Sequence, residues 1–264
     1  MAQLSEWAGL VTGRNDDFDK LTVQAPLAVG THTWSGPFRA VADDGNEYFV
    51  KCLETCPSNG ESSLVAEYVV ARMGALISAP VCHTSLIRIP EELSGWEPKP
   101  GTPIKPGIAH ACRAIERVNF SRPPILSRDR DDNRRRHVGV YALFDWCAGS
   151  DEQWLYDLDN DHTIYSHDHG WYLPPMHTGH WTRDALIADV DTPHPYSESP
   201  ANLSSAAIDE VASALEAVTR ADLVSVLRQV PLSWPVTTGD LEALGWYLET
   251  RATGVAARLR ALAV

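Results

Sequence analysis

The sequence predicts an α+β fold in which a strand-rich first half is followed by a mostly helical second half. Residues 27–53 carry alternating, β-branched and aromatic side chains on both sides of a turn-forming segment, residues 43–46 (DDGN). Residues 62–77 then change to helical spacing, and helical patterns recur from about Thr182 to the end. With 264 residues, 44% of them hydrophobic, the chain can fill one large core or the cores of two lobes.

The first half is expected to contain several strands and one helix. The segment around DDGN fits a hairpin preceded by another strand, three strands in all. A helix of about four turns is expected from Ser62 to Ile77, because its apolar residues follow a period of about 3.6. TSLIRI (84–89) fits a short strand, residues 90–107 with five prolines and three glycines fit a loop, and residues 108–115 fit a last strand.

The second half is expected to be built around a buried helix. Residues 137–147 are apolar nearly all round, which is typical of a helix in the middle of a lobe. The basic run before it, residues 134–137, follows several aspartates and is interpreted as a solvated helix start. Two short strands should flank Asn160 and Asp161. Helical patterns follow in SAAIDEVASALEAVT, ADLVSVLRQV and TGDLEALGWYLETRATGVAARLRAL.

Charge and cysteine usage restrict the class of protein. The formal net charge of −13, from 35 acidic and 22 basic residues, disfavours a nucleic-acid partner. No basic segment followed by an apolar run opens the chain, and no long uncharged window is visible, so we expect a cytoplasmic protein without a membrane partner. An odd number of cysteines without a CxxC pair indicates reduced thiols: Cys52, Cys56, Cys82, Cys112 and Cys147.

Four charged residues occur in an informative order. Lys51 lies in the middle of a predicted strand, and Glu67 follows sixteen residues later on the predicted helix. A strand lysine that faces solvent on an edge is the simpler interpretation of Lys51 alone, but the pair matches the lysine and glutamate that hold nucleotide phosphates in protein kinases. Asp151 directly follows the buried helix, and Asp168 follows the two short strands in an Asp-x-Gly sequence. A kinase requires this order of a base, a hairpin and a metal-binding aspartate.

With these residues and their surroundings, the chain resembles the HipA-like kinases, specifically a compact bacterial branch with a bilobal protein- and lipid-kinase-like fold. The resemblance runs from about Gly30 to Leu262 and is carried by YFVKC, SLVAEYVVARMGALISAPV, GSDEQWLYD, SHDHGWYLP, LSWPV and LGWYLETRATGVAARL. It implies a small nucleotide-binding lobe, residues 1–118, and a helical catalytic lobe, residues 119–264. It further implies an ATP- and Mg²⁺-dependent phosphotransferase, with Lys51 on the phosphates, Glu67 orienting Lys51, Asp151 as base and Asp168 on the metal.

The resemblance sets an order of expectations for the phosphate acceptor and for activity. A protein serine or threonine is the first expectation from the resemblance, and a small hydroxylated metabolite is the second. The third expectation is that the chain is a catalytically silent module that binds nucleotide without transferring phosphate.

Two segments depart from the family pattern. The catalytic loop is shortened, so Gln153 becomes the second metal ligand, with Asp157 as a substitute. Alternatively, Gln153 holds the catalytic loop through a hydrogen bond. The expected phosphate loop, residues 30–36, is not a G-x-G-x-x-G motif, but Gly30 and Gly36 would let backbone amides approach phosphates.

A histidine-metal hydrolase is the rival interpretation of YSHDHGWYLPP. The chain has ten histidines, and His167, His169, His177 and His180 could supply imidazole ligands for Zn²⁺ or Mn²⁺. No His-Glu-x-x-His motif accompanies them, and in an extended segment Asp168 would point away from both neighbouring histidines. We therefore expect a carboxylate site for Mg²⁺ at Asp168, with His167 and His169 packed around it.

Overall fold

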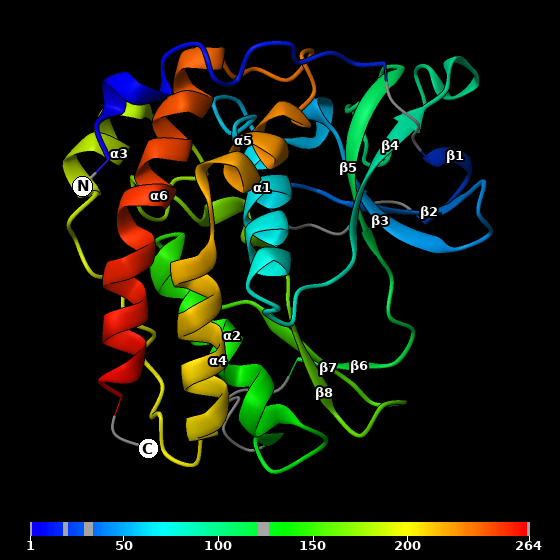
Figure 1. The fold of residues 1–264 in the computed structure, drawn as a ribbon. Helices are drawn as coiled ribbons and strands as arrows, with labels where there is room; N and C mark the ends of the chain where they lie inside the picture. The colour runs from blue at the N-terminus through cyan, green and yellow to red at the C-terminus, as the bar shows by residue number, and fades with distance from the viewer. Residues whose placement is uncertain (1, 18–20, 29–33, 121–126, 263–264) are drawn as a thin grey trace.

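The computed structural model describes residues 2–17, 21–28, 34–120 and 127–262. Strands and helices are largely segregated: β1 to β5 gather on one side of the molecule, and most of the helices form the other side (Figure 1). The predicted α+β class is confirmed.

The strand-rich side is a five-stranded sheet that closes on itself in the order β1-β2-β3-β5-β4. Its strands are β1 (Leu21–Ala28), β2 (Phe38–Ala42), β3 (Glu47–Lys51), β4 (Thr84–Ile89) and β5 (Gly107–Arg113). Neighbours are antiparallel except for the short parallel contact of β1 with β4. The hairpin turn forms where it was predicted, since the amide of Gly45 donates to the carbonyl of Ala42. β1 begins at Leu21, six residues before the predicted strand region.

The interior of the closed sheet is a small apolar cluster of its own. Val23, Phe38, Tyr48 and Ile87 are almost completely buried within it. The loop between β4 and β5 adds Ile104 and Trp96, and the Trp96 ring lies edge-on to the Phe38 ring with centroids 5.1 Å apart. This core fixes the position of β3, whose last residue is Lys51.

Helix α1 (Ser63–Leu76) matches the predicted helix to within one residue at each end. It lies between the closed sheet and the helical side (Figure 1). Its apolar side chains belong to the large core that the helices of the second half share. Because α1 is buried on nearly all sides, it presents Glu67 to the interior of the protein.

Helix α2 (Asn133–Trp146) is the first helix of the second half, and it packs against the last strand of a three-stranded sheet. The strands are β6 (Val118–Asn119), β7 (Trp154–Asp157) and β8 (Thr163–Ser166). β7 and β8 are the two predicted short strands, whereas β6 was not predicted. α2 starts four residues earlier than the apolar run, because the buried Asn133 side chain donates to the carbonyls of Ser127 and His162 and accepts from the amide of Ile164.

The remaining helices are α3 (Arg183–Asp189), α4 (Ser205–Ala217), α5 (Arg220–Arg228) and α6 (Thr238–Arg260). Of these, α4 and α6 pack against α2, and α3 and α5 pack against α6. Thr219 caps α5 and Thr237 caps α6, each in a capping box with the aspartate three residues later. No helix in the described part of the chain is both long and apolar enough to cross a lipid bilayer.

Candidate active site

Lys51, Glu67 and Asp168 meet where β3, α1 and the segment after β8 come together. The Lys51 ammonium forms ion pairs with a carboxylate oxygen of Glu67 and with Oδ1 of Asp168, the latter at 2.5 Å. β3 lies between β2 and β5, and only 7% of Lys51 is exposed, so it is not a solvent-facing edge lysine. The second carboxylate oxygen of Glu67 accepts from the backbone amide of His169 at 2.9 Å. Three segments far apart in the sequence are thus joined around one ammonium group.

The Asp-x-Gly segment adopts the conformation that this arrangement requires. Asp168 has a left-handed backbone (φ +56°) and precedes a short 3₁₀ turn, His169–Trp171. A Cβ at Gly170 would lie 3.0 Å from Oε1 of Glu67, so a larger residue would press on that carboxylate. Glycine at this position lets the turn approach α1 closely.

Burial and the shared ammonium shift the pKa values of all three groups. Burial raises the pKa of Glu67 to about 7, with Lys51 acting in the opposite direction. Burial also opposes ionisation of Asp168, but the adjacent Lys51 ammonium outweighs it and lowers the pKa of this carboxyl. Burial disfavours the charged amine of Lys51, yet Asp168 and Glu67 raise its pKa. At neutral pH, Lys51 and Asp168 are therefore charged, while Glu67 readily takes up a proton.

Asp151 and Gln153 border the same cavity as Glu67 and Asp168. The cavity has a volume of about 190 Å³, and its other lining residues are Trp34, Ser35, Gly170 and Trp171. The Gln153 amide donates from Nε2 to Oδ2 of Asp151 at 2.8 Å. The predicted hydrogen bond that holds the catalytic loop is thus present, and the amide oxygen of Gln153 is left as a second polar group.

The donor set around this cavity fits Mg²⁺. Carboxylate and amide oxygens are suitable ligands for a hard cation, and Asp168 and Gln153 supply one of each. Asp157 does not belong to this set. Its carboxylate oxygens accept from the amide of Asp159 (3.0 Å) and from Nδ2 of Asn160 (2.6 Å), so they stabilise the β7–β8 turn. Asp157 therefore does not line the cavity that Gln153 and Asp168 share.

The four histidines of the rival hydrolase interpretation are not assembled into one site. His169 is buried and its Nε2 lies 2.8 Å from the Ser166 hydroxyl, whereas Nδ1 of His180 lies 3.2 Å from the Ser62 hydroxyl. Within the described ranges, no group of three or more His, Cys, Asp or Glu residues is placed to hold a metal ion together. Burial lowers the pKa of His167 to about 4 and that of His169 to about 3, which keeps both rings neutral.

His110 is a third neutral imidazole beside the ion pairs, and the sequence interpretation missed it. It lies on β5 directly opposite Lys51 and is 2% exposed. Its Nε2 is 3.2 Å from the Thr84 hydroxyl, and burial lowers its pKa to about 3, with Lys51 acting in the same direction. Only the pairing register of β3 and β5 places it there, and a single sequence does not reveal that register.

The expected phosphate loop is only partly described. Gly30 lies outside the described residues. Gly36 has a positive φ of +49°, and Nζ of Lys99 lies 3.1 Å from the position that a Cβ at Gly36 would take. Lys99, from the loop between β4 and β5, also donates to the carbonyl of Thr55. Glycine at position 36 therefore makes room for a lysine in this structure.

Trp34 connects this loop to the helical side, a contact that the sequence interpretation also missed. Its ring lies edge-on to Trp171, with centroids 5.8 Å apart. A Cβ at Gly60 or Gly179 would lie 2.6 Å or 2.3 Å from the Trp34 ring. Both glycines are therefore needed for the indole to lie where it does, beside the Asp151–Asp168 cavity.

Comparisons with known proteins agree with this geometry. The family model described as HipA-like kinase matches residues 27–157, which include Lys51, Glu67, Asp151 and Gln153, and the predicted resemblance is thereby confirmed. The crystal structure of the Helicobacter pylori proinflammatory kinase CtkA is similar over 95% of this chain and 99% of that chain, with a TM-score of 0.57 and 12% sequence identity. At this identity the likeness shows a kinase-like fold. No curated protein matches the chain.

Proposed function

We propose that this HipA-like chain binds ATP with Mg²⁺ and transfers a phosphoryl group to a hydroxyl. The observation that carries the proposal is that one buried ammonium, Lys51, contacts both Glu67 and Asp168, while Asp151 borders the same cavity. The acceptor we propose is a protein serine or threonine, with a small hydroxylated metabolite as the second choice. The active arrangement is bilobal, with residues 1–118 and 119–264 on either side of the nucleotide.

Each residue has a role that follows from its position. The Lys51 ammonium is held by Glu67 and would contact the phosphates, since phosphoryl transfer depends mainly on positioning and charge neutralisation. Asp168 and Gln153 would hold Mg²⁺, which when bound neutralises negative charge on the phosphates. Asp151 would accept the proton of the acceptor hydroxyl. The hydrogen bond from Gln153 restricts the carboxylate of Asp151 to one orientation, which favours proton transfer in a fixed direction.

The first experiment tests nucleotide binding and needs no acceptor. Isothermal titration with ATP should show binding only when Mg²⁺ is present at comparable concentration, and ATP·Mg²⁺ should raise the unfolding temperature as its concentration increases. Failure of ATP·Mg²⁺ to bind, together with stabilisation by Zn²⁺ alone, would instead favour the hydrolase.

The second experiment separates an enzyme from a silent nucleotide-binding module. Asp151→Asn keeps an oxygen that can accept from Gln153 but removes the base, so transfer of labelled γ-phosphate to lysate proteins should fall about 10²- to 10⁴-fold while ATP binding is unchanged. Asp168→Asn should weaken both. Asp159→Asn, which changes an exposed carboxylate in the β7–β8 turn, is the control and should alter neither. Wild-type protein that binds ATP but labels neither itself nor any lysate protein would support the silent module.

A further inference from the structure

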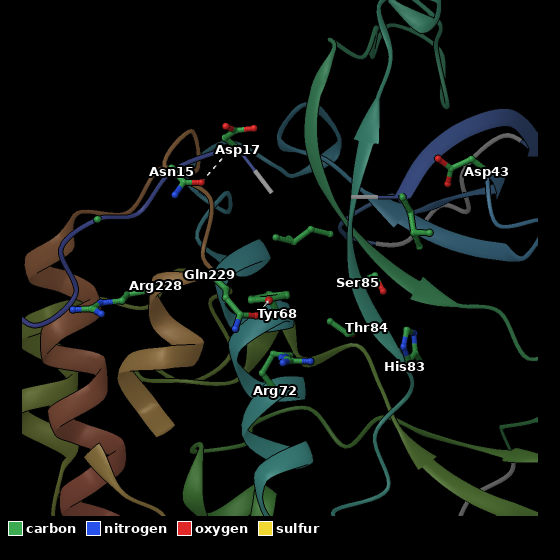
Figure 2. Close-up of a pocket in the computed structure, with 13 residues that line it drawn as sticks. Asn15, Asp17, Asp43, Tyr68, Arg72, His83, Thr84, Ser85, Arg228 and Gln229 are labelled. Atoms are coloured by element: carbon green, nitrogen blue, oxygen red, sulfur yellow. Dashed lines mark hydrogen bonds between the residues drawn. The ribbon is translucent and has the colours of Figure 1, made fainter. Parts of the chain in front are cut away.

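A second cavity, of about 890 Å³, lies between α1, β4 and the end of α5 (Figure 2). We call it the α1–β4 groove. Its lining residues come from the N-terminal segment (Gly13, Asn15, Asp17), from β1 and the β2–β3 turn (Leu21, Asp43), from α1 (Tyr68, Arg72), from β4 and the residue before it (His83, Thr84, Ser85, Leu86) and from the end of α5 (Arg228, Gln229). It shares no lining residue with the Asp151–Asp168 cavity.

Arg72 lines this groove with a side chain that no carboxylate of the described residues neutralises. Acidic residues outnumber basic ones by 35 to 22, and many arginines form ion pairs with carboxylates: Arg39, Arg117, Arg130, Arg135, Arg136, Arg220, Arg251, Arg258 and Arg260. Among the described residues, Arg72 has no ion pair, and its buried Nε has no hydrogen-bond partner. A buried donor without a partner is unfavourable, so this guanidinium is available for an external acceptor.

The lining residues drawn beside Arg72 carry hydrogen-bonding groups without negative charge. Figure 2 shows the Arg72 side chain extending from α1 toward β4, where Thr84, Ser85 and His83 follow one another along the chain. The Tyr68 hydroxyl, on the same helix, donates to Oε1 of Gln229 at 2.9 Å and so joins α1 to the end of α5. This end of the groove therefore presents the Arg72 cation, the Thr84 and Ser85 hydroxyls and the His83 imidazole, beside the Tyr68 hydroxyl that is bound to Gln229.

The acidic residues of the groove lie away from Arg72. Asp17 and Asp43 are at the opposite end in Figure 2. The carboxylate of Asp43 already accepts from the backbone amide of Thr22 at 3.0 Å. The charge of the groove is thus separated along its length, and an anion at the Arg72 end does not meet a carboxylate.

We propose that the α1–β4 groove binds a phosphomonoester group through Arg72, with Thr84, Ser85 and His83 as further hydrogen-bonding partners. The planar guanidinium fork matches the oxygens of a phosphate better than an ammonium does. A volume of about 890 Å³ is within the range of small-molecule sites, about 300–1,000 Å³, and exceeds the needs of inorganic phosphate. The remaining space suits the body of a phosphorylated metabolite or the residues that flank a phosphoserine.

The groove is connected to the ion pairs of the candidate active site. Arg72 is on the same helix as Glu67, and the Thr84 hydroxyl lies 3.2 Å from Nε2 of His110, which is paired opposite Lys51. An anion that links Arg72 to Thr84 would therefore brace α1 against β4. The binding proposal itself does not depend on kinase activity.

Nuclear magnetic resonance of arginine side chains tests the proposal directly. The Nε–H resonance of Arg72, assigned by its loss in Arg72→Lys, should shift on titration with three probes: inorganic phosphate, glucose 6-phosphate and a glycine-rich phosphoserine peptide. Isothermal titration with the same probes compares the variants, since Arg72→Met lacks the resonance, and this change should weaken binding at least about tenfold, the effect of losing one charge-assisted contact. Arg88→Met removes an exposed β4 arginine that does not line the groove, and it should bind like the wild type.

The outcomes are distinct from those of the kinase tests. Asp168→Asn should leave the titration unchanged, which separates the groove from phosphate binding at the candidate active site. Tighter binding of the phosphopeptide would identify a protein segment as the source of the phosphate, and tighter binding of glucose 6-phosphate would identify a metabolite. Equal affinity of wild type and Arg72→Met, or a resonance of Arg72 that does not move with any probe, would overturn the proposal. If Arg72→Met does not fold, the affinity of Arg72→Lys and the shift of the Arg72 resonance in the wild type still test the proposal.

Discussion

Replacing Gly179 by alanine should destabilise the protein mainly through Trp34. Gly179 has a positive φ of +64°, and the contact distance of 2.3 Å to the Trp34 ring is about 1.1 Å shorter than the 3.4 Å at which ordinary contact begins. Left-handed backbone in a residue with a Cβ costs roughly 1–2 kcal/mol, and overpacking of this kind costs about 1–3 kcal/mol. The free energy of unfolding should therefore fall by about 2–5 kcal/mol in total.

Gly95 provides the matched control. Its φ is +80° and a Cβ there would meet nothing within 4 Å, so Gly95→Ala should cost only the backbone part, about 1–2 kcal/mol. Urea unfolding followed by circular dichroism measures both variants, and each is repeated in a Trp34→Ala background. The excess cost of Gly179→Ala should disappear when Trp34 is absent. Equal costs for Gly179→Ala and Gly95→Ala in the Trp34-containing protein would refute the steric reasoning.

Three further predictions concern the buried ionisable groups. Lys51→Met leaves two carboxylates without their cation and should lower the free energy of unfolding by about 3–5 kcal/mol. The double variant Lys51→Met/Glu67→Leu should recover part of this loss. If urea titrations show no recovery, the unpaired Glu67 carboxylate is not the cause of the destabilisation. The pKa of Glu67 is raised from 4.5 to about 7, so the native state keeps a proton that the unfolded chain releases, and this contribution to stability is lost as the pH rises from 4.5 through 7. Glu67→Gln should remove that loss, and an unchanged pH profile between these values would contradict the assignment. The pKa of His110 is lowered from 6.5 to about 3, so the stability that its neutral ring contributes is present above pH 6.5 and declines as the pH falls toward 3. His110→Leu should reduce the slope of the unfolding free energy against pH by up to about 1.4 kcal/mol per pH unit between these values. An equal slope in both proteins would count against a buried neutral ring.

Local patterns in the sequence were sufficient for most of the secondary structure. α1, the hairpin turn at residues 43–46 and the pair β7–β8 depend on periodicity and turn chemistry within short windows, and they form where they were predicted. Residues 134–137, interpreted as a solvated helix start, form the first turn of α2, which begins one residue earlier at Asn133. The side-chain bonds from Asn133 to distant carbonyls, which no local pattern reveals, hold that first turn in place. β6 was missed because two residues without a pattern become a strand only by pairing with β7.

In the candidate site, too, some residues could be predicted from the sequence and others only from the structure. The order of Lys51, Glu67 and Asp168 along the chain was enough to predict that they act together, and the structure brings them into contact. His110 and Trp34 could not be predicted, because one depends on strand register and the other on two glycines remote in sequence that admit its ring. Residues chosen for their chemistry are visible in a sequence, whereas residues that matter through packing become visible only in three dimensions.

The two separate cores have a consequence for motion within the molecule. Lys51 is the last residue of a strand that belongs to the core of the closed sheet, whereas Glu67 is on α1, whose apolar side chains belong to the large helical core. A well-packed core moves as a unit, so rocking of one side against the other concentrates displacement at the boundary between them. The Lys51–Glu67 ion pair crosses that boundary. The distance between the Lys51 and Glu67 side chains would therefore change when the two sides move relative to each other. One spectroscopic label on β3 and another on α1 would report that movement without any substrate.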